Sequence, residues 1–213
     1  MTKQQWQIAA AAAVAVVLVW MLWPSGLSRV KNLDSPNRNI IAFGDSLTYG
    51  YGAQPGEDWP SRLSAALGKP IVNAGVNGDT TTSALARLDA DVLSQDPRIV
   101  IVGLGGNDFL SNTSPATTEA NLREIVRRIQ AARGIVVLLS FKFPSFNADY
   151  DAMYTRIAKS ERCYLIPGIL SGILTDQSLK SDEIHPNAKG YALMASRMEK
   201  PMRKLLGRAE EER

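Results

Sequence analysis

Short apolar runs rich in β-branched residues alternate along this chain with segments that have the apolar spacing of a helix. The runs are only three to five residues long, which favours strands over helices. The expected strands cover 40–43, 71–73, 99–102, 135–139 and 164–166. The expected helices cover 59–67, 80–93, 115–133, 148–160 and 187–206. Such alternation predicts an α/β fold in which helices cover both faces of a parallel sheet.

Glycines and polar residues stand where the first three of these strands end. Asp45 and Ser46 come after Gly44, the second strand runs into Gly75, and Asn107 follows two glycines after the third strand. The carboxyl ends of parallel strands meet at one edge of a sheet, and open α/β sheets bind ligands at that edge. We therefore expect a site there, with Ser46 as a candidate nucleophile. Ser46 could instead serve only as a cap for the following helix.

A second chemical signal lies near the carboxyl end, where Asp182 and His185 are three residues apart. In a tight turn that spacing lets the carboxylate bind one imidazole nitrogen, which orients the other nitrogen outward. A serine within reach of such a histidine becomes an activated nucleophile. His185 is the only histidine in the sequence, so a mechanism that needs two imidazoles is excluded. Taken alone, the pair has a simpler interpretation as a surface histidine and a solvated turn residue.

Four sequence blocks together resemble the GDSL or SGNH hydrolase family over about residues 40–206. The blocks are Gly-Asp-Ser-Leu at 44–47, the glycine at 75, Gly-Gly-Asn-Asp at 105–108 and Asp-x-x-His-Pro at 182–186. The neighbouring residues are most similar to the thioesterase I, lysophospholipase and arylesterase branch. The resemblance implies a flavodoxin-like three-layer α/β/α fold and a serine hydrolase that cleaves acyl esters, aryl esters, lysophospholipids or thioesters. A polysaccharide O-acetylesterase of the same fold is the alternative.

The resemblance also implies roles for individual residues. Ser46 matches the nucleophile, His185 the general base and Asp182 the residue that orients the base. Gly75, Asn107 and the backbone N–H of Ser46 match the oxyanion hole, whose donors stabilise the charge of a tetrahedral intermediate. The residues that bind the rest of the substrate are not identified.

The chain departs from the family pattern at two places. Glu183 stands where close relatives have a glycine after the orienting aspartate, so a second carboxylate is available near His185. Residues 141–150 differ from the segment that helps form the acyl-binding loop in relatives. The preferred acyl length is therefore left open.

Several other functions fit the sequence less well. The glycines at 103 and 105 lack the third glycine of a dinucleotide-binding loop, and the G-x-S-x-G motif of an α/β-hydrolase is missing. An inactive binding module is disfavoured because every block is present. With Cys163 and His185 as the only cysteine and histidine, we expect neither a metal site nor a cofactor. The formal charge of +3 is small, so we expect no nucleic-acid partner, and we expect a monomer.

Residues 8–23 form an unbroken apolar run that follows Lys3 and precedes Pro24. A membrane-spanning helix usually needs about 20 residues, so the run suffices only together with its neighbours. We expect residues 1–27 to form an apolar helix that acts as a membrane anchor or as a cleaved signal peptide. A buried core helix is the remaining interpretation.

The other expected segments are a linker at 28–38, the hydrolase domain at 39–208 and a charged tail at 209–213. The positive charges around the apolar run weakly favour a cytoplasmic domain, whereas its likeness to a secretory leader favours export. We expect a protein of the bacterial inner membrane with its catalytic domain in the periplasm or outside. A secreted or periplasmic enzyme, freed by signal cleavage, is the alternative.

Overall fold

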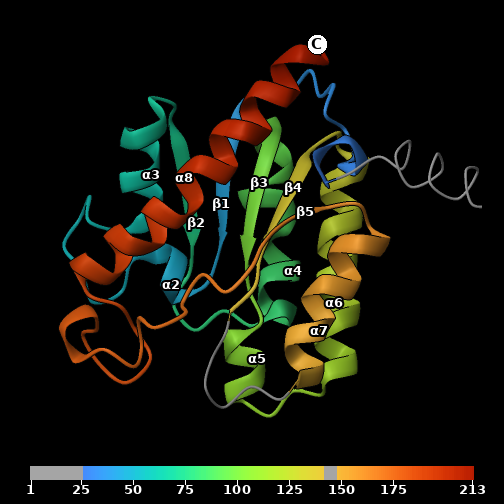
Figure 1. The fold of residues 1–213 in the computed structure, drawn as a ribbon. Helices are drawn as coiled ribbons and strands as arrows, with labels where there is room; N and C mark the ends of the chain where they lie inside the picture. The colour runs from blue at the N-terminus through green and yellow to red at the C-terminus, as the bar shows by residue number, and fades with distance from the viewer. Residues whose placement is uncertain (1–25, 142–147) are drawn as a thin grey trace, which may run out of the picture.

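Five parallel strands form a sheet in the order β2-β1-β3-β4-β5 (Figure 1). The computed structural model describes residues 26–141 and 148–213. The strands are β1 (Asn39–Gly44), β2 (Ile71–Gly75), β3 (Pro97–Gly103), β4 (Ile135–Leu139) and β5 (Tyr164–Ile166). β1 pairs with β2 on one side and with β3 on the other, so the chain reverses its direction of travel across the sheet beside β1. Open α/β sheets bind their ligands at such a switch point.

Helices cover the two faces of the sheet and give the fold three layers (Figure 1). On one face lie α3 (Trp59–Leu67) and α8 (Ala188–Glu211), which pack against each other. On the other face lie α4 (Thr81–Asp91), α6 (Pro115–Ala131) and α7 (Ala148–Ser160). The expected three-layer α/β/α fold with a parallel sheet is confirmed, and every residue of the central strand β3 is buried.

Shorter helices fill the connections between these elements. α2 (Ser46–Tyr49) and α5 (Gly106–Leu110) begin just after β1 and β3, at the carboxyl edge of the sheet. The described residues also contain three 3₁₀ helices: η1 (Gly26–Arg29), η2 (Leu93–Gln95) and η3 (Gln177–Leu179). Ser46 and Asn107 therefore lie close to the sheet, whereas Asp182 and His185 lie in the longer connection between β5 and α8.

Polar side chains cap several of the helices at their first turn. Asp58 caps α3, Thr80 caps α4 and Ser114 caps α6, each by accepting a backbone N–H of the first turn. These bonds satisfy donors that have no partner within the helix. On α6, Arg123 pairs with Glu119 one turn away at 2.7 Å, and Arg128 reaches Asp89 of α4 at 2.5 Å.

The segment expected to form a linker, 28–38, lies against the domain. Val30 and Leu33 are buried in the main core, as is Leu27 just before them. The side chain of Asn32 donates hydrogen bonds to the carbonyl oxygens of Gln130 and Gly134, at 2.8 and 3.0 Å. The packed part of the chain thus begins before the expected domain start at residue 39, and the division into linker and domain stays a prediction.

The apolar run at 8–23 lies outside the described residues. Within 26–141 and 148–213, the structure contains no helix with the length and apolar character of a membrane span.

Candidate active site

Ser46 is the first residue of α2, directly beyond the carboxyl end of β1. Asp45 caps this helix, because its Oδ1 accepts the backbone N–H of Leu47 at 3.0 Å. Gly50 ends the helix with a φ of 96°, a conformation that glycine adopts without strain. The cap is therefore Asp45, and the side chain of Ser46 is left available for another partner.

That partner is His185, which the fold brings from the other end of the sequence. Ser46 Oγ lies 2.9 Å from His185 Nε2, although the two residues are 139 positions apart. His185 Nδ1 lies 2.8 Å from Asp182 Oδ2 and 3.0 Å from Asp182 Oδ1. In the tautomer that satisfies both contacts, Nδ1–H donates to Asp182 and the Ser46 hydroxyl donates to Nε2. The three side chains form a continuous nucleophile, base and carboxylate chain.

The loop around Asp182 holds its carboxylate in place. Oδ1 accepts the backbone N–H groups of Ile184 and His185, each at 2.9 Å. Burial acts to raise the pKa of Asp182, but the donors from Ile184 and His185 outweigh it and hold the pKa below its ordinary value. Asp182 is therefore ionised at neutral pH. Glu183 turns away instead, with a side chain 91% exposed and paired to Lys180 at 3.2 Å.

Tyr51 contacts the histidine from the side of α2, a contact that the sequence analysis did not foresee. Its ring lies 4.6 Å from the His185 ring, centroid to centroid, at an angle of 45°. The hydroxyl of buried Tyr191 donates to the backbone oxygen of Tyr51 at 2.8 Å and fixes the loop that carries it. The imidazole is thus held by the Asp182 carboxylate and by an aromatic neighbour.

Of the predicted oxyanion residues, Asn107 lies at the cavity, whereas the N–H of Gly75 is already bound to another group. Asn107 lines the small cavity beside Ser46, and one N–H of its amide donates to the backbone oxygen of Asp79 at 2.9 Å. The Gly75 N–H already donates to Asn73 Oδ1 at 3.0 Å. A Cβ at Gly75 would lie 2.2 Å from the backbone nitrogen of Tyr49, so close packing against α2 explains this glycine.

Gly78 offers a second backbone N–H in the same connection. It has a φ of 79°, and no hydrogen bond from its N–H is found within the described residues. The backbone oxygen of its neighbour Asp79 accepts the amide of Asn107, a residue that lines the cavity. The run Gly-Asp-Thr at 78–80 was visible in the sequence, but nothing local distinguished its glycine from Gly75.

The cavity beside Ser46 has apolar side chains at its rim. Its lining includes Leu47, Leu110 and Ile184 together with Asn107 and His185. Leu110 and Ile184 are 52% and 36% exposed, which leaves them free to contact a ligand. Among the described residues, no group of three or more His, Cys, Asp or Glu side chains could hold a metal ion.

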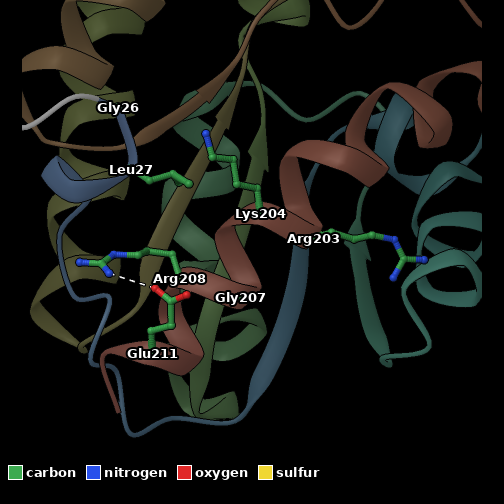
Figure 2. Close-up of a pocket in the computed structure, with 7 residues that line it drawn as sticks. All are labelled: Gly26, Leu27, Arg203, Lys204, Gly207, Arg208 and Glu211. Carbon is green, nitrogen blue, oxygen red and sulfur yellow. Dashed lines mark hydrogen bonds and ion pairs between the residues drawn. The ribbon is translucent and has the colours of Figure 1, made fainter.

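A larger hollow, of about 610 Å³, lies elsewhere, between η1 and the last turns of α8 (Figure 2). Both of its arginines already have partners: Arg203 donates to the carbonyl oxygen of Ala66, and Arg208 pairs with Glu211 at 3.0 Å. Both η1 and the last turns of α8 lie at the amino edge of the sheet, away from α2 and α5 (Figure 1). This hollow contains no nucleophile and base pair and is not the candidate site.

Asp45, beside the serine, is a buried carboxyl only 2% exposed. Burial raises the pKa of Asp45 to about 7, and the nearby Asp79 and Asp108 carboxylates act in the same direction. The folded protein therefore holds a proton that the unfolded chain has lost, between about pH 4 and pH 7. Stability contributed by this proton is present at acidic pH and is lost as the pH rises through 7.

Asp45→Asn should remove the loss of folding stability with rising pH, because the asparagine does not ionise. Its side-chain oxygen can still accept the Leu47 N–H. We expect the melting temperature of the variant, relative to wild type, to rise between pH 5 and pH 8. The difference between the folded and unfolded pKa of Asp45 lowers the free energy of unfolding of the wild type by up to about 4 kcal/mol at pH 8. Thermal unfolding of both proteins across this range checks the prediction, and a constant gap between them would contradict it.

The sequence is similar to those of known proteins. A profile of the GDSL-like lipase/acylhydrolase family matches residues 42–193. The chain is 33% identical over 175 residues to thioesterase 1/protease 1/lysophospholipase L1 of Escherichia coli K12, covering 78% of this chain and 84% of the relative. It is 28% identical to an arylesterase of Vibrio mimicus, covering 75% and 85%.

The fold is also similar to that of a solved esterase. The structure of the psychrotrophic esterase EstA from a Pseudoalteromonas species superimposes with a TM-score of 0.71 at 30% identity. The match covers 79% of this chain and 98% of the other. The similarity therefore extends over nearly the whole of that enzyme.

Proposed function

Because this chain belongs to the GDSL-like lipase/acylhydrolase family and is an esterase-type hydrolase, we propose that Ser46, His185 and Asp182 carry out its catalysis as a triad. The observation that carries this proposal is the 2.9 Å contact between Ser46 Oγ and His185 Nε2, continued from Nδ1 to Asp182. A serine joined to an oriented neutral imidazole is equipped to attack an acyl carbonyl carbon.

Each step of the reaction has a group in place. Ser46 Oγ attacks the carbonyl carbon while its proton passes to His185 Nε2, and Asp182 stabilises the imidazolium that forms. When the tetrahedral intermediate collapses, His185 returns the proton to the leaving oxygen or sulfur, and the acyl group stays on Ser46. A water molecule, deprotonated by the same imidazole, then attacks this acyl-enzyme. Its hydrolysis releases the acid and restores the serine.

The negative charge of each intermediate needs preorganised donors, and we assign three. The N–H of Ser46 has no partner within the described residues, and the Asn107 amide keeps a second N–H beyond the one bound to Asp79. Gly75 was the third donor expected from the sequence, but its N–H is engaged by Asn73. Gly78 is the better candidate for this third donor, because its N–H is available on the peptide next to Asp79.

Asn107→Ala tests this oxyanion hole. Loss of one donor that acts mainly in the transition state should lower kcat by about 10²- to 10³-fold and leave KM nearly unchanged. Steady-state kinetics with a soluble ester measures both constants. An effect confined to KM would instead place Asn107 in substrate binding.

Asp182→Asn and Glu183→Gln form a matched pair that separates the two neighbouring carboxylates. Asp182 contacts the His185 ring, and its loss should reduce kcat by roughly 10⁴-fold, the effect known for a triad aspartate. Glu183 points into solvent, so its variant should stay within about threefold of wild type. Equal losses, or a larger loss for Glu183→Gln, would reverse the assignment.

The apolar rim indicates which esters fit this site. Leu110 and Ile184 flank the nucleophile and offer an acyl chain or aryl ring a surface to bury, and buried apolar area stabilises binding. We therefore propose acyl esters, aryl esters, lysophospholipids or acyl thioesters as substrates. A sugar-bound acetyl group would gain little from these two side chains.

A panel of p-nitrophenyl esters from acetate to palmitate, with an acyl-CoA, a lysophospholipid and an acetylated polysaccharide, tests this choice. We expect kcat/KM to rise beyond acetate, and the polysaccharide to be a poor substrate. A preference for the polysaccharide would favour the O-acetylesterase alternative, while loss of all activity against esters and thioesters would refute the proposed function.

Residues 1–27 are proposed to direct export, either as an anchor in the inner membrane or as a cleaved signal. An alkaline phosphatase fusion after Arg213 should then be active in a bacterial host, whereas a green fluorescent protein fusion should be dark. The opposite pattern would place the catalytic domain in the cytoplasm. We also propose a monomer, which light scattering on the purified protein would test.

A further inference from the structure

Arg87, in the middle of α4, is a largely buried cation close to the active-site edge of the sheet. Its side chain is 17% exposed, and its guanidinium carbon lies 4.5 Å from the centre of the buried Phe43 ring. Its nitrogens donate to two strand ends and two carboxylates. The acceptors are the carbonyl oxygens of Gly44 and Ala74, both at 3.0 Å, Asp79 Oδ2 at 2.6 Å and Asp91 Oδ2 at 2.7 Å.

These acceptors belong to the segments that carry the catalytic groups. Gly44 is the last residue of β1, two positions before Ser46, and Ala74 lies at the end of β2. The Gly44 carbonyl also accepts the N–H of Val76 at 3.0 Å, so the guanidinium binds where the two connections meet. One side chain thereby fixes the end of the serine's strand relative to the neighbouring loop.

The contact with Asp79 extends this link to the proposed oxyanion hole. Arg87 holds the Asp79 carboxylate, and the backbone oxygen of Asp79 accepts the Asn107 amide at 2.9 Å. Gly78, whose N–H is the proposed third donor, shares a peptide bond with Asp79. A shift of this loop would therefore move two of the three proposed donors relative to Ser46.

We infer that Arg87 is a positioning residue for catalysis, which sets the distance between the nucleophile and the oxyanion donors without touching the substrate. The inference rests on the proposed function of the Ser46 site. It follows from geometry: a misplacement of about 1 Å at the reacting centre can cost about 100-fold in rate. The aspartate side of the link is an ion pair in which both side chains are largely buried, with Asp79 6% exposed, so its loss would leave a buried charge unpaired.

We expect that a lysine at position 87 cannot perform the positioning role of the arginine. A guanidinium presents five N–H donors in a planar fork, whereas an ammonium has three donors on a flexible stem. The four acceptors around Arg87 lie on separate segments, and a point charge cannot bind all of them in fixed directions. Arg87→Lys thus retains the positive charge but loses the directed hydrogen bonds to the four acceptors.

The test compares Arg87→Lys and Arg87→Ala with Arg128→Ala, which removes an arginine–aspartate pair between α6 and the same helix α4. We expect both Arg87 variants to lose about 10- to 100-fold in kcat, with KM within about threefold of wild type. The Ki of phenylboronic acid, which forms a tetrahedral adduct on a catalytic serine, should rise in parallel. Arg128→Ala should retain wild-type kcat and Ki.

Activity is measured well below the melting temperature of each variant, so that unfolding does not contribute. If Arg87→Ala does not fold, the test uses Arg87→Lys, Asp79→Asn and the double variant instead. The double variant should then lose less kcat than the product of the two single losses, because both substitutions break the same contact. Full kcat in Arg87→Lys, or lower stability with unchanged kcat and Ki, would overturn the inference. An inactive wild-type enzyme would instead refute the proposed function.

Discussion

Ser46→Ala is expected to lower kcat for any ester substrate by roughly 10⁶-fold, the loss found when the serine of a comparable triad is removed. No acyl-enzyme can form without Oγ, and the remaining oxyanion donors sustain only slow attack by water. Within the described residues the Ser46 hydroxyl is hydrogen-bonded to His185 alone, and the substitution removes a single atom, so the melting temperature should change little.

Covalent labelling provides a second measurement for this prediction. A fluorophosphonate should modify wild type at Ser46 and leave Ser46→Ala unlabelled, as shown by peptide mass spectrometry. Ser94→Ala, at an exposed serine of η2 that is far from α2 in sequence and bonded only to Ala90, serves as the control and should react like wild type. Labelling of another residue with Ser46 unmodified would refute the assignment.

His185→Ala is expected to have a loss of the same order, because the chain contains no other imidazole. The base accepts a proton from Ser46 only in its neutral form, so wild-type activity should fall in acid through one ionisation. In the variant the small remaining activity should lose this dependence. A variant that retained a tenth of the wild-type rate would contradict the role of His185.

The pH profile needs one control, because Asp45 lies beside Ser46 and has a pKa raised to about 7. The titration of Asp45 could itself lower or raise activity near neutral pH. Asp45→Asn removes the carboxyl and keeps the helix cap, so the acid limb should persist in this variant. Disappearance of the limb would assign the ionisation to Asp45 instead of to His185.

The sequence by itself determined the class of the fold and the residues worth testing. Short apolar runs separated by helical segments admit few arrangements other than a parallel sheet between helix layers, because each element must bury its apolar face. Ser46, Asn107, Asp182 and His185 can all be recognised in the sequence. Their signals are local: a strand end, a glycine-rich connection and a three-residue spacing.

Only the tertiary structure decided how these groups are used. The distance between Ser46 and His185 depends on how α8 and the loop before it return to the end of β1, which no local pattern specifies. Gly75 and Gly78 look alike in sequence, but the Asn73 side chain occupies one N–H and leaves the other available. Arg87 resembles any arginine on the polar side of a helix until Gly44, Ala74 and Asp79 surround it.

The physical reason is that composition and periodicity report which surfaces are buried, whereas a catalytic role depends on direction. A hydrogen-bond donor acts on a substrate only if no nearer acceptor takes it, and that acceptor can come from any strand or loop at the same edge. Burial by neighbouring elements likewise raises the pKa of Asp45 to about 7, although its sequence neighbours would leave it an ordinary carboxylate.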